Sequence, residues 1–590
     1  MRVAVLLEDR CAPNMPAFAY LQKYAGMCGS ECIQVVDNKC KILETACPVC
    51  LNRAKHCPGD AVILINLPQE LESDMTHCFG ENGFRVFRLP TPREEAVVGI
   101  LGQNGMGKST AVQILSGSLR PNLGDWDDEK EWDEIIESYP KGELRDYLEK
   151  VALSGVRIAV KPQYVDKLPK IFDGLVSELL ARVDDREEIE KWTEEMGIIH
   201  LMERKLGELS GGELQRVAIC ATLLKDADVY FFDEATSYLD IHERMRVTKI
   251  IQALAEMGKR VLVVEHDLAI LDVLCDQVHI VYGERAGYGI FTPARTTRVA
   301  INAYLNGHLV EQNMRIRDKP IKFHTGRIRS EEIGEPILQW GGLQKSLGEF
   351  TLNSKEGTVH SAEVVGIVGP NATGKTTLVR ILAGELESDE GWTTMDAKVS
   401  YKPQHVKATF DGTVREWLDT ALGRAWHSGE FQSKVVRPLN VDQLLELQAR
   451  KLSGGELQAV WIVLCLGKDA DIYLLDEPSA HLDANARMEA AKAIRRTMEA
   501  NEKSAFVIDH DVYFIDIVSD SLLVFEGEGG VHGKAMGPYS LRDGMNRFLN
   551  DVNVTFRRDH DSKRPRINKA ESRKDREQRE VGDFYSFDSK

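Results

Sequence analysis

Two glycine-rich segments of the chain each end in a lysine followed by two hydroxyl side chains. Both fit the pattern G-x4-G-K-[ST], in which backbone N–H groups surround phosphate oxygens, the lysine reaches the β and γ phosphates and the first hydroxyl binds Mg²⁺. The chemistry expected of these segments is the binding of ATP with Mg²⁺. The predicted ligands are Gly102, Asn104, Gly105, Gly107, Lys108, Ser109 and Thr110 in the first segment, and Gly369, Asn371, Gly374, Lys375, Thr376 and Thr377 in the second.

A pair of carboxylates follows each of two apolar runs. Residues 229–232 precede Asp233 and Glu234, and residues 472–475 precede Asp476 and Glu477. A continuous apolar run is typical of a strand buried in a parallel sheet, which places both acids at its carboxyl end. There we expect the aspartates to hold Mg²⁺ and the glutamates to polarise the attacking water.

Each half also has a glutamine and a histidine in positions suited to the same reaction. Gln163 and Gln404 both follow Lys-Pro, and we expect them to contact the metal and the attacking water. His266 follows the buried run 261–264, and His510 occupies the matching place in the second half; both are expected to face the γ-phosphate. The predicted magnesium set is Ser109, Gln163, Asp233, Thr376, Gln404 and Asp476.

A serine, two glycines and a glutamate open a predicted helix twice, as Ser210-Gly211-Gly212-Glu213 and as Ser453-Gly454-Gly455-Glu456. The N–H groups at a helix N-terminus favour phosphate. This order of motifs, met twice, resembles that of ATP-binding cassette proteins. The resemblance implies that the serine–glycine loop of one half closes on the nucleotide of the other. It also implies that Asp240 and Asp483 touch the opposite half.

The elements that must position these residues form an internal repeat, which predicts an α/β chain with two tandem cassettes. The predicted divisions are a Cys-rich module (1–80), two nucleotide-binding domains (81–291 and 349–526), a linker (292–348) and a hinge with a polar, frayed tail (527–590). The first domain carries an insertion at 125–151, whose spacing predicts a helix–loop–helix. It could be a docking element or a neutral surface insertion, and the sequence favours neither.

Eight cysteines lie in the first 78 residues and three in the rest of the chain. In a chain without a signal peptide this distribution indicates metal ligation or its remnant. Residues 47–58 nearly match a bacterial ferredoxin run, but Arg53 stands at the third ligand position, and a guanidinium cannot ligate iron. One rearranged cluster, a zinc site and no metal all remain open.

The bulk properties exclude several classes of protein. No apolar run is long enough for a transmembrane helix, so we expect a cytoplasmic protein; a transporter would need a separate membrane subunit. A net charge of −18 argues against non-specific coating of nucleic acid. The basic residues from Arg557 onwards could form a local RNA-binding patch or a solvated tail.

Along nearly its whole length the chain resembles subfamily E of the ATP-binding cassette proteins, the ribosome-recycling ATPases also called RNase L inhibitors. The features that carry the resemblance are the two Ser-Gly-Gly-Glu segments (the signatures), the insertion, and the segments 161–166, 237–240, 264–267 and 555–569. It implies a ferredoxin-like domain with iron–sulfur clusters, two cassettes and two hinges. It also implies ATP-driven splitting of ribosomes, with the small subunit and its rRNA, release or rescue factors, and initiation factors as partners of a monomer.

The N-terminal module departs from this family, because only Cys11, Cys47, Cys50 and Cys57 sit at family ligand positions. His481 and Ala459 also replace the usual tyrosine and arginine. None of these changes removes a catalytic group. We expect adenine to stack on Phe84 or Phe87 in one site and on Phe350 in the other.

Two rival functions fit the same motifs. One is a twin-cassette translation factor that does not split ribosomes, and the other is a binding or inhibitory protein that ATP merely clamps.

Overall fold

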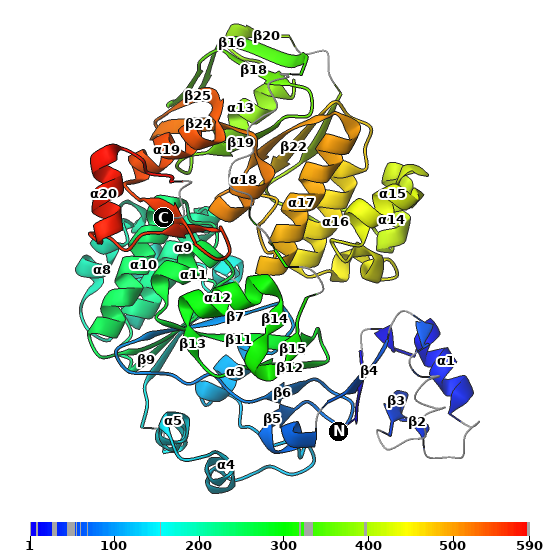
Figure 1. The fold of residues 1–590 in the computed structure, drawn as a ribbon. Coiled ribbons are helices and arrows are strands. Elements are labelled where there is room, and N and C mark those ends of the chain that lie inside the picture. Colours follow the sequence, from blue (N-terminus) through cyan, green and yellow to red (C-terminus); the bar gives the residue numbers. More distant parts are fainter. Residues whose placement is uncertain are drawn as a thin grey trace.

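The computed structural model (Figure 1) describes the 590-residue chain apart from residues 1, 8–9, 14, 26–31, 44–53, 55, 59–60, 68, 154, 164, 318–319, 322, 324–333, 395–397 and 587–590. A small N-terminal module lies beside the first of two cassettes, and the second cassette is stacked on the first. The C-terminal segment lies where the two cassettes meet.

The N-terminal module is built from short elements around an apolar centre. Strand β1 (Arg2–Leu6) pairs antiparallel with β4 (Val62–Asn66), as the β-branched runs predict, and β2 (Ile33–Val36) pairs with β3 (Lys39–Ile42). Helix α1 (Pro16–Tyr24) packs on this hairpin and buries Phe18 and Leu21. Asn82 joins the module to the first cassette, because its side-chain amide donates to the carbonyls of Ala4 and Ile42.

A mixed sheet forms the centre of the first cassette, in the order β5-β6-β12-β11-β7-β10-β9-β8. Neighbours among β11, β7, β10, β9 and β8 run parallel and are apolar along most of their length, because helices cover both faces. The strands are β5 (Met75–Cys78), β6 (Arg85–Phe87), β7 (Val97–Gly102), β8 (Ile158–Lys161), β9 (Val229–Asp233), β10 (Arg260–Val264), β11 (Gln277–Glu284) and β12 (Tyr288–Phe291). The longer helices are α3 (Lys108–Leu115), α7 (Val176–Val183), α9 (Gly211–Leu223), α10 (Ile241–Glu256), α11 (Leu268–Leu274) and α12 (Thr297–Asn306).

The second cassette repeats this plan, with the sheet order β18-β16-β17-β25-β24-β19-β23-β22-β21. The run β24-β19-β23-β22-β21 matches β11-β7-β10-β9-β8 strand for strand, which confirms the internal repeat. The strands are β16 (Pro336–Leu347), β17 (Phe350–Ser354), β18 (Gly357–His360), β19 (Val364–Val368), β20 (Glu390–Thr393), β21 (Val399–Lys402), β22 (Ile472–Asp476), β23 (Ser504–Ile508), β24 (Ser521–Glu528) and β25 (His532–Ser540). The longer helices are α13 (Lys375–Leu382), α14 (Val414–Leu422), α16 (Gly454–Leu466), α17 (Ala484–Asn501), α18 (Val512–Val518) and α19 (Leu541–Val552).

Three predicted boundaries need correction. Strand β16 belongs to the sheet of the second cassette, so that cassette begins before residue 349. Strand β25 and helix α19 pack on β24, so it extends well past residue 526. Strand β5 already belongs to the first cassette, before residue 81. The added strands lie outside the nucleotide motifs, so their mixed composition resembled linker sequence.

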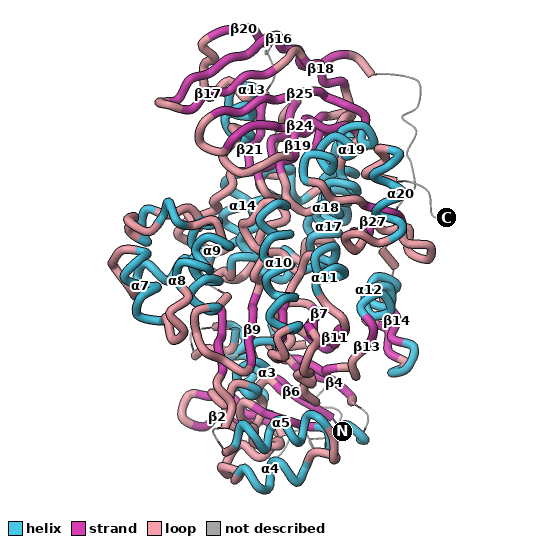
Figure 2. Tube along the Cα trace, turned by 90° about the vertical axis from the view of Figure 1, so that its left-hand side faces the viewer, coloured by secondary structure: helices cyan, strands magenta, loops and turns pink. Residues whose placement is uncertain are grey.

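The insertion forms helices α4 (Trp132–Ser138) and α5 (Glu143–Ala152), separated at Pro140–Gly142 as predicted. Figure 2 shows the two helices side by side at the end of the molecule that carries the N-terminus. Tyr147 of α5 is buried, and its hydroxyl donates to the carbonyl oxygen of Leu115 at 2.8 Å. The insertion is therefore anchored on α3, the helix that follows the first phosphate loop.

The expected frayed tail is wrong for most of its length. After the hairpin β26 (Phe556–Arg558) and β27 (Pro565–Ile567), the chain forms α20 (Arg573–Val581) and buries Tyr585. The tyrosine hydroxyl donates to Asp516, and Arg558 donates to the same hydroxyl at 3.1 Å. One aromatic residue near the end thus holds a polar segment whose composition predicted disorder.

Candidate functional site

Both phosphate loops have the geometry that their glycines require. Gly105 and Gly107 have φ of 77° and 83°, a left-handed conformation that glycine adopts without steric cost. The ammonium of Lys108 turns back over the loop and donates to the carbonyl of Gly102 at 2.8 Å. Lys375 does the same with Gly369 at 2.8 Å, and burial lowers its pKa to about 8 despite the attraction of nearby carboxylates such as Asp240. Each lysine is thus already aimed into its loop.

Each glutamate that we predict to be catalytic directly follows its buried strand. Glu234 and Glu477 have φ of 49° and 46°, and such left-handed backbone costs non-glycine residues of order 1–3 kcal/mol. Several contacts hold this conformation in the first half. The amide of Glu234 donates to the carbonyl of Val264 at 2.9 Å, and its own carbonyl accepts from Lys161 at 3.2 Å and from Gln215 at 2.7 Å.

The second half repeats these supports with Lys402 and Gln458, which donate to the carbonyl of Glu477 at 3.1 and 2.6 Å. We did not predict a role for these lysines and glutamines. The available signal was their recurrence, since Lys-Pro-Gln and Ser-Gly-Gly-Glu-Leu-Gln occur in both halves.

The structure brings the predicted catalytic side chains together in each half. Gln163 donates to the Glu234 carboxylate at 2.7 Å, and His266 Nε2 lies 3.6 Å from the same oxygen. In the second half Gln404 and His510 contact Glu477 at the same two distances, 2.7 and 3.6 Å. Each glutamate therefore has a neutral donor and an imidazole beside it, the arrangement expected where a water must be held and deprotonated.

The acids differ in their electrostatics. Burial, with the charge of the adjacent glutamate, raises the pKa of Asp233 and of Asp476 to about 6. Burial alone would also raise the pKa of Glu477, but the hydrogen bond and charge of His510, with Lys375 and Lys402, hold it at about 2. Glu477 is thus ionised as a base must be. A divalent cation bound beside these aspartates would lower their pKa again, because it favours their charged form.

The magnesium ligands predicted from the sequence lie together. Thr376 donates to Asp476 at 2.8 Å, so the hydroxyl that follows the loop lysine faces the strand aspartate. Ser109, Gln163 and Asp233 line one common cavity in the first half. These oxygen-rich sets suit Mg²⁺, which binds few protein carboxylates and keeps waters and phosphate oxygens.

The cavity of the first site is built from both cassettes. It has a volume of about 470 Å³ and is lined by the first phosphate loop and by Ser453, Gly454 and Gly455 of the second half. We call the segments that end at Asp240 and Asp483 (residues 237–240 and 479–483) the D-loops. Gly455 lies close to the D-loop of its own half, since a Cβ placed on it would lie 2.7 Å from the carbonyl oxygen of His481. The lid of this pocket therefore comes from the opposite half.

Each signature serine caps the helix that it precedes. The Ser210 hydroxyl donates to the Glu213 carboxylate at 2.7 Å and accepts from the Glu213 amide, and Ser453 makes the same pair with Glu456. This capping box fixes the serine and the first N–H groups of α9 and α16 at the helix ends that lie near the opposite phosphate loops.

Reciprocal contacts join each D-loop to the opposite phosphate loop. The backbone N–H of Asn104 donates to the Asp483 carboxylate at 3.2 Å, and the backbone N–H of Asn371 donates to the Asp240 carboxylate at 3.0 Å. A Cβ on Gly212 would lie 3.9 Å from Asn371, so the Ser210 turn also lies near the second loop. The two predicted composite sites therefore face each other across one interface.

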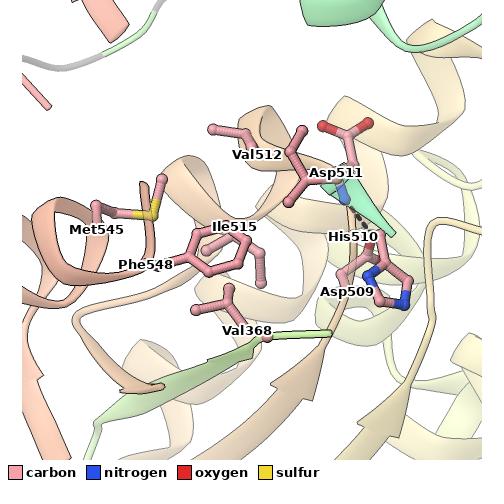
Figure 3. A pocket seen from close by; sticks show the side chains of 10 residues that line it. Val368, Asp509, His510, Asp511, Val512, Ile515, Met545 and Phe548 are labelled. Carbon is pink, nitrogen blue, oxygen red and sulfur yellow. Dashed lines mark hydrogen bonds between the residues drawn. The ribbon is translucent and has the colours of Figure 1, made fainter. Parts of the chain in front are cut away.

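His510 stands at the carboxyl end of β23, as Figure 3 shows, next to a small cavity of about 10 Å³. Val368, Ile515 and Phe548 line this cavity, which is near the size of one water molecule. Val368 ends β19, the strand that leads into the second phosphate loop, so His510 and this strand line the same cavity.

Two of the predicted aromatic residues occupy equivalent positions and the third does not. The Phe84 ring lies 2.9 Å from the position of a Cβ on Gly107, and Phe350 lies equally close to that position on Gly374. Phe84 also lines the first cavity. Phe87 is fully buried and packs edge-on against Tyr288, so its proposal as a stacking residue is wrong. Phe84 precedes β6 and lies at the phosphate loop, whereas Phe87 ends β6 inside the core, a difference that the sequence did not predict.

Of the predicted metal ligands in the N-terminal module, Cys11 and Cys57 are buried in one apolar cluster, and Cys47 and Cys50 lie outside the described residues. Among the described residues no group of three His, Cys, Asp or Glu side chains could hold a metal ion. Cys78 is committed to β5 of the first cassette, where its thiol donates to the carbonyl of Gly80 at 2.9 Å. Seven of the eight early cysteines remain, too few for two four-cysteine clusters.

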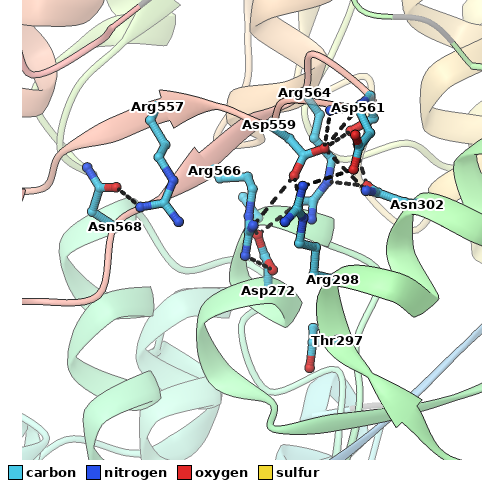
Figure 4. A network of polar contacts seen from close by, with 12 residues as sticks. Asp272, Thr297, Arg298, Asn302, Arg557, Asp559, Asp561, Arg564, Arg566 and Asn568 are labelled. Carbon is cyan, nitrogen blue, oxygen red and sulfur yellow. Dashed lines mark hydrogen bonds and ion pairs between the residues drawn. The ribbon is translucent and has the colours of Figure 1, made fainter. Parts of the chain in front are cut away.

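Several of the basic C-terminal residues make ion pairs within the protein, so the prediction of a solvated tail is wrong for them. Arg564 and Arg566 reach Asp272 of α11 at 3.0 and 2.6 Å, and Asp559 pairs with Arg298 of α12 at 3.0 Å (Figure 4). Asp272 and Arg564 are almost fully buried. Because α11 and α12 belong to the first cassette and β27 follows the second, these ion pairs join the two halves.

Two facing cassettes, each with a phosphate loop, a strand-end Asp-Glu pair and a signature helix aimed at its partner, define a twin ATP-binding cassette protein. The ABC transporter family matches residues 91–237 and 352–480. None of the helices in the described parts of the chain is long and apolar enough to cross a membrane.

Relatives match the whole chain. Translation initiation factor RLI1 of Saccharomyces cerevisiae is 40% identical over 606 residues, covering 100% of this chain and 98% of that protein. The archaeal ribosome recycling factor aABCE1, solved with ribosomal stalk protein aP1, is 48% identical with a TM-score of 0.83, over 88% of this chain and 100% of that one. A chain from a model of ribosome-bound archaeal Pelota and ABCE1 is 46% identical to this chain, with a TM-score of 0.94 over 99% of each chain. The chain belongs to the ABCE1/RLI1 (RNase L inhibitor) family.

Proposed function

We propose that the chain is an ATPase that uses the closure of its two cassettes to split ribosomes into subunits. The observation that carries the proposal is the composite cavity, because a pocket shared by two cassettes closes only when both halves approach the same nucleotide. The full-length likeness to a ribosome recycling factor supplies the target. The partners we propose are the small subunit with its rRNA, a rescue or release factor and initiation factors, in the cytoplasm.

Binding begins at the phosphate loops. Lys108 and Lys375 leave their carbonyl partners for the β and γ phosphates, and Phe84 and Phe350 offer their rings to adenine. Ser109, Gln163 and Asp233 in one site, and Thr376, Gln404 and Asp476 in the other, would hold Mg²⁺, which would supply positive charge next to the phosphates. The lids Ser453–Gly455 and Ser210–Gly212 then add N–H donors from the opposite half, so the closed state binds ATP more tightly than the open one.

Hydrolysis reopens the cassettes. Glu234 and Glu477 accept a proton from the water that attacks the γ-phosphorus, and Gln163 and Gln404 orient that water. His266 and His510 face the γ-phosphate while the bond to ADP, the leaving group, breaks. Burial and the charge of Lys108 depress the pKa of His266 well below its ordinary value, so it is a neutral imidazole. Once the γ-phosphate is gone, the lids lose the group that they shared with the loops.

The N-terminal module would transmit this motion, because Asn82 attaches it to the first cassette. We propose that it carries at most one four-thiolate group and not the pair of clusters that the family implies. No step above depends on such a group.

Sedimentation tests the proposal. Purified chain, ATP and a rescue factor are mixed with vacant ribosomes, and subunits are separated on a sucrose gradient. We expect ATP-dependent conversion of whole ribosomes to subunits. The double variant Glu234→Gln plus Glu477→Gln should stay bound to small subunits and should not hydrolyse ATP repeatedly. Intact ribosomes together with normal ATP hydrolysis would support the non-splitting translation factor instead, and absence of hydrolysis would support the ATP-clamped binding protein.

A further inference from the structure

The two ATP sites differ at one turn. The turn between β11 and β12 lies over the first phosphate loop, where the Ala286 amide donates to the Gly105 carbonyl at 3.1 Å. The turn between β24 and β25 lies over the second loop in the same way, since the Gly530 amide donates to the Ala372 carbonyl at 2.9 Å. These equivalent bonds align Ala286 with Gly530, so Arg285 corresponds to Gly529. Only the first turn carries a cation at this position.

The loop beneath each turn is matched to it. A Cβ on Gly105 would lie 3.1 Å from Cγ of Arg285, so the absence of a side chain there leaves room for the arginine stem. In the second loop the equivalent residue is Ala372, whose Cβ lies 3.6 Å from the position that a Cβ on Gly529 would take. Glycine under arginine and alanine under glycine are complementary pairs, which indicates that the arginine is built into the first site.

The guanidinium reaches across the interface. It donates to Glu456 Oε1 at 2.7 Å, beside the signature serine of the opposite cassette, while Oε2 of that glutamate accepts from the amide and hydroxyl of Ser453. Arg285 also lines the cavity of about 470 Å³ together with Lys108. In the second site the equivalent glutamate, Glu213, pairs with Arg204 of its own cassette at 3.8 Å.

We propose that Arg285 is a nucleotide-binding residue found in the first ATP site and not in the second. When ATP occupies the cavity, the guanidinium donates to anionic oxygens of the nucleotide while Glu456 fixes its position, so a single side chain contacts the ligand and the lid. Guanidinium groups suit this task because they are permanently charged, weakly hydrated and able to donate two parallel hydrogen bonds to phosphate. The first site then binds ATP more tightly than the second. This inference concerns the ATP sites of the function proposed above.

The test measures each site separately by photolabelling with 8-azido-ATP, followed by proteolysis and quantification of labelled peptides that contain Phe84 or Phe350, the residues proposed to contact adenine. Arg285→Ala should raise the ATP concentration that half-labels the first site about tenfold, as loss of a charge-assisted hydrogen bond implies, and should leave the second unchanged. Arg285→Lys, which keeps the charge and loses the fork, should fall between. Arg204→Ala is the matched control, an equally exposed arginine on the equivalent glutamate, and should change neither site.

A role confined to the ion pair is separated by a double-mutant cycle. If Arg285 contacts ATP, its replacement by alanine still weakens the first site at least about fivefold in a Glu456→Gln background. An effect that disappears in that background, an equal loss at both sites, or an unchanged curve would each overturn the inference. No ribosome is present, so failure of ribosome splitting would leave this result untouched, and a negative result here would leave the splitting proposal standing.

Discussion

Glu234 and Glu477 each lie one residue beyond a buried strand in left-handed backbone, a conformation that a glutamate adopts only when its surroundings require it. The lysine ammonium and glutamine amide that hold each glutamate carbonyl supply that requirement. The carboxylates are thereby aimed away from the strand axis and towards the glutamine and histidine partners.

Removing the base tests this geometry. Glu234→Gln combined with Glu477→Gln should lower kcat for ATP hydrolysis about 10²- to 10⁴-fold, because the amide keeps the shape of the site but accepts no proton. Phosphate release reports kcat, and equilibrium binding of a fluorescent ATP analogue should be retained. Undiminished hydrolysis would show that another group is the base.

Short motifs predicted the chemistry of the site because their residue order requires particular loops and strand ends. Gly102 to Thr110, for example, predicted a phosphate loop that the structure contains. The role of Arg285 could not be predicted, because it acts across an interface with Glu456, 171 residues further along the chain. Contacts of that kind depend on how the cassettes pack, which local spacing does not encode.

At the scale of elements, the C-terminal hairpin and α20 have no continuous apolar face, and their order depends on a few anchors. Asp516 receives the Tyr585 hydroxyl and the guanidinium of Arg558, and all three side chains are buried. A polar segment can fold in this way when each buried charge has a partner, since an unpaired one would be costly. Composition therefore gave a wrong expectation of fraying.

Tyr585→Phe tests the anchor. It removes the hydroxyl from a buried network and should cost about 1–3 kcal/mol of stability, which lowers the melting temperature. Differential scanning calorimetry measures the shift. Tyr539→Phe is the control, since that hydroxyl only accepts from Arg547 at 3.3 Å on the exposed surface, and it should melt like the parent protein.

The N-terminal module gives a second prediction at this scale. Because Cys78 belongs to the cassette sheet, anaerobically purified protein should contain no more than four iron atoms per chain, measured with acid-labile sulfide. Zinc at about one atom per chain, or no metal, agrees equally well with the structure. Eight iron atoms would contradict it.

At the scale of the whole molecule, each D-loop aspartate contacts the phosphate loop of the opposite cassette. One oxygen of Asp240 caps α10 by accepting from Glu243, and the other accepts from the Asn371 amide of the opposite half. Asp483 likewise caps α17 and contacts Asn104. Each aspartate can therefore make its second hydrogen bond only when the opposite phosphate loop lies against it.

Asp240→Asn with Asp483→Asn separates these two tasks. Each asparagine oxygen still caps its helix, but its amide now meets a backbone N–H group, so donor faces donor across the interface. We expect the cassettes to need about tenfold more ATP to close, with little change in melting temperature. Hill analysis of ATPase rates and thermal scans measure the two quantities. An unchanged ATP dependence would show that the D-loops do not couple the sites.

The ion pairs of Arg564 and Arg566 with Asp272 need a part of the chain that leaves the ribosome after both cassettes. During synthesis the earlier domains fold as they emerge, so both cassettes can acquire their nucleotide motifs before those arginines exist. A product that stops before Arg564 would keep every ATP-binding motif yet lack the ion pairs of Arg564 and Arg566 that join its halves. Premature termination before Arg564 should therefore yield a protein that binds and hydrolyses ATP without coupling hydrolysis to useful work between its two halves.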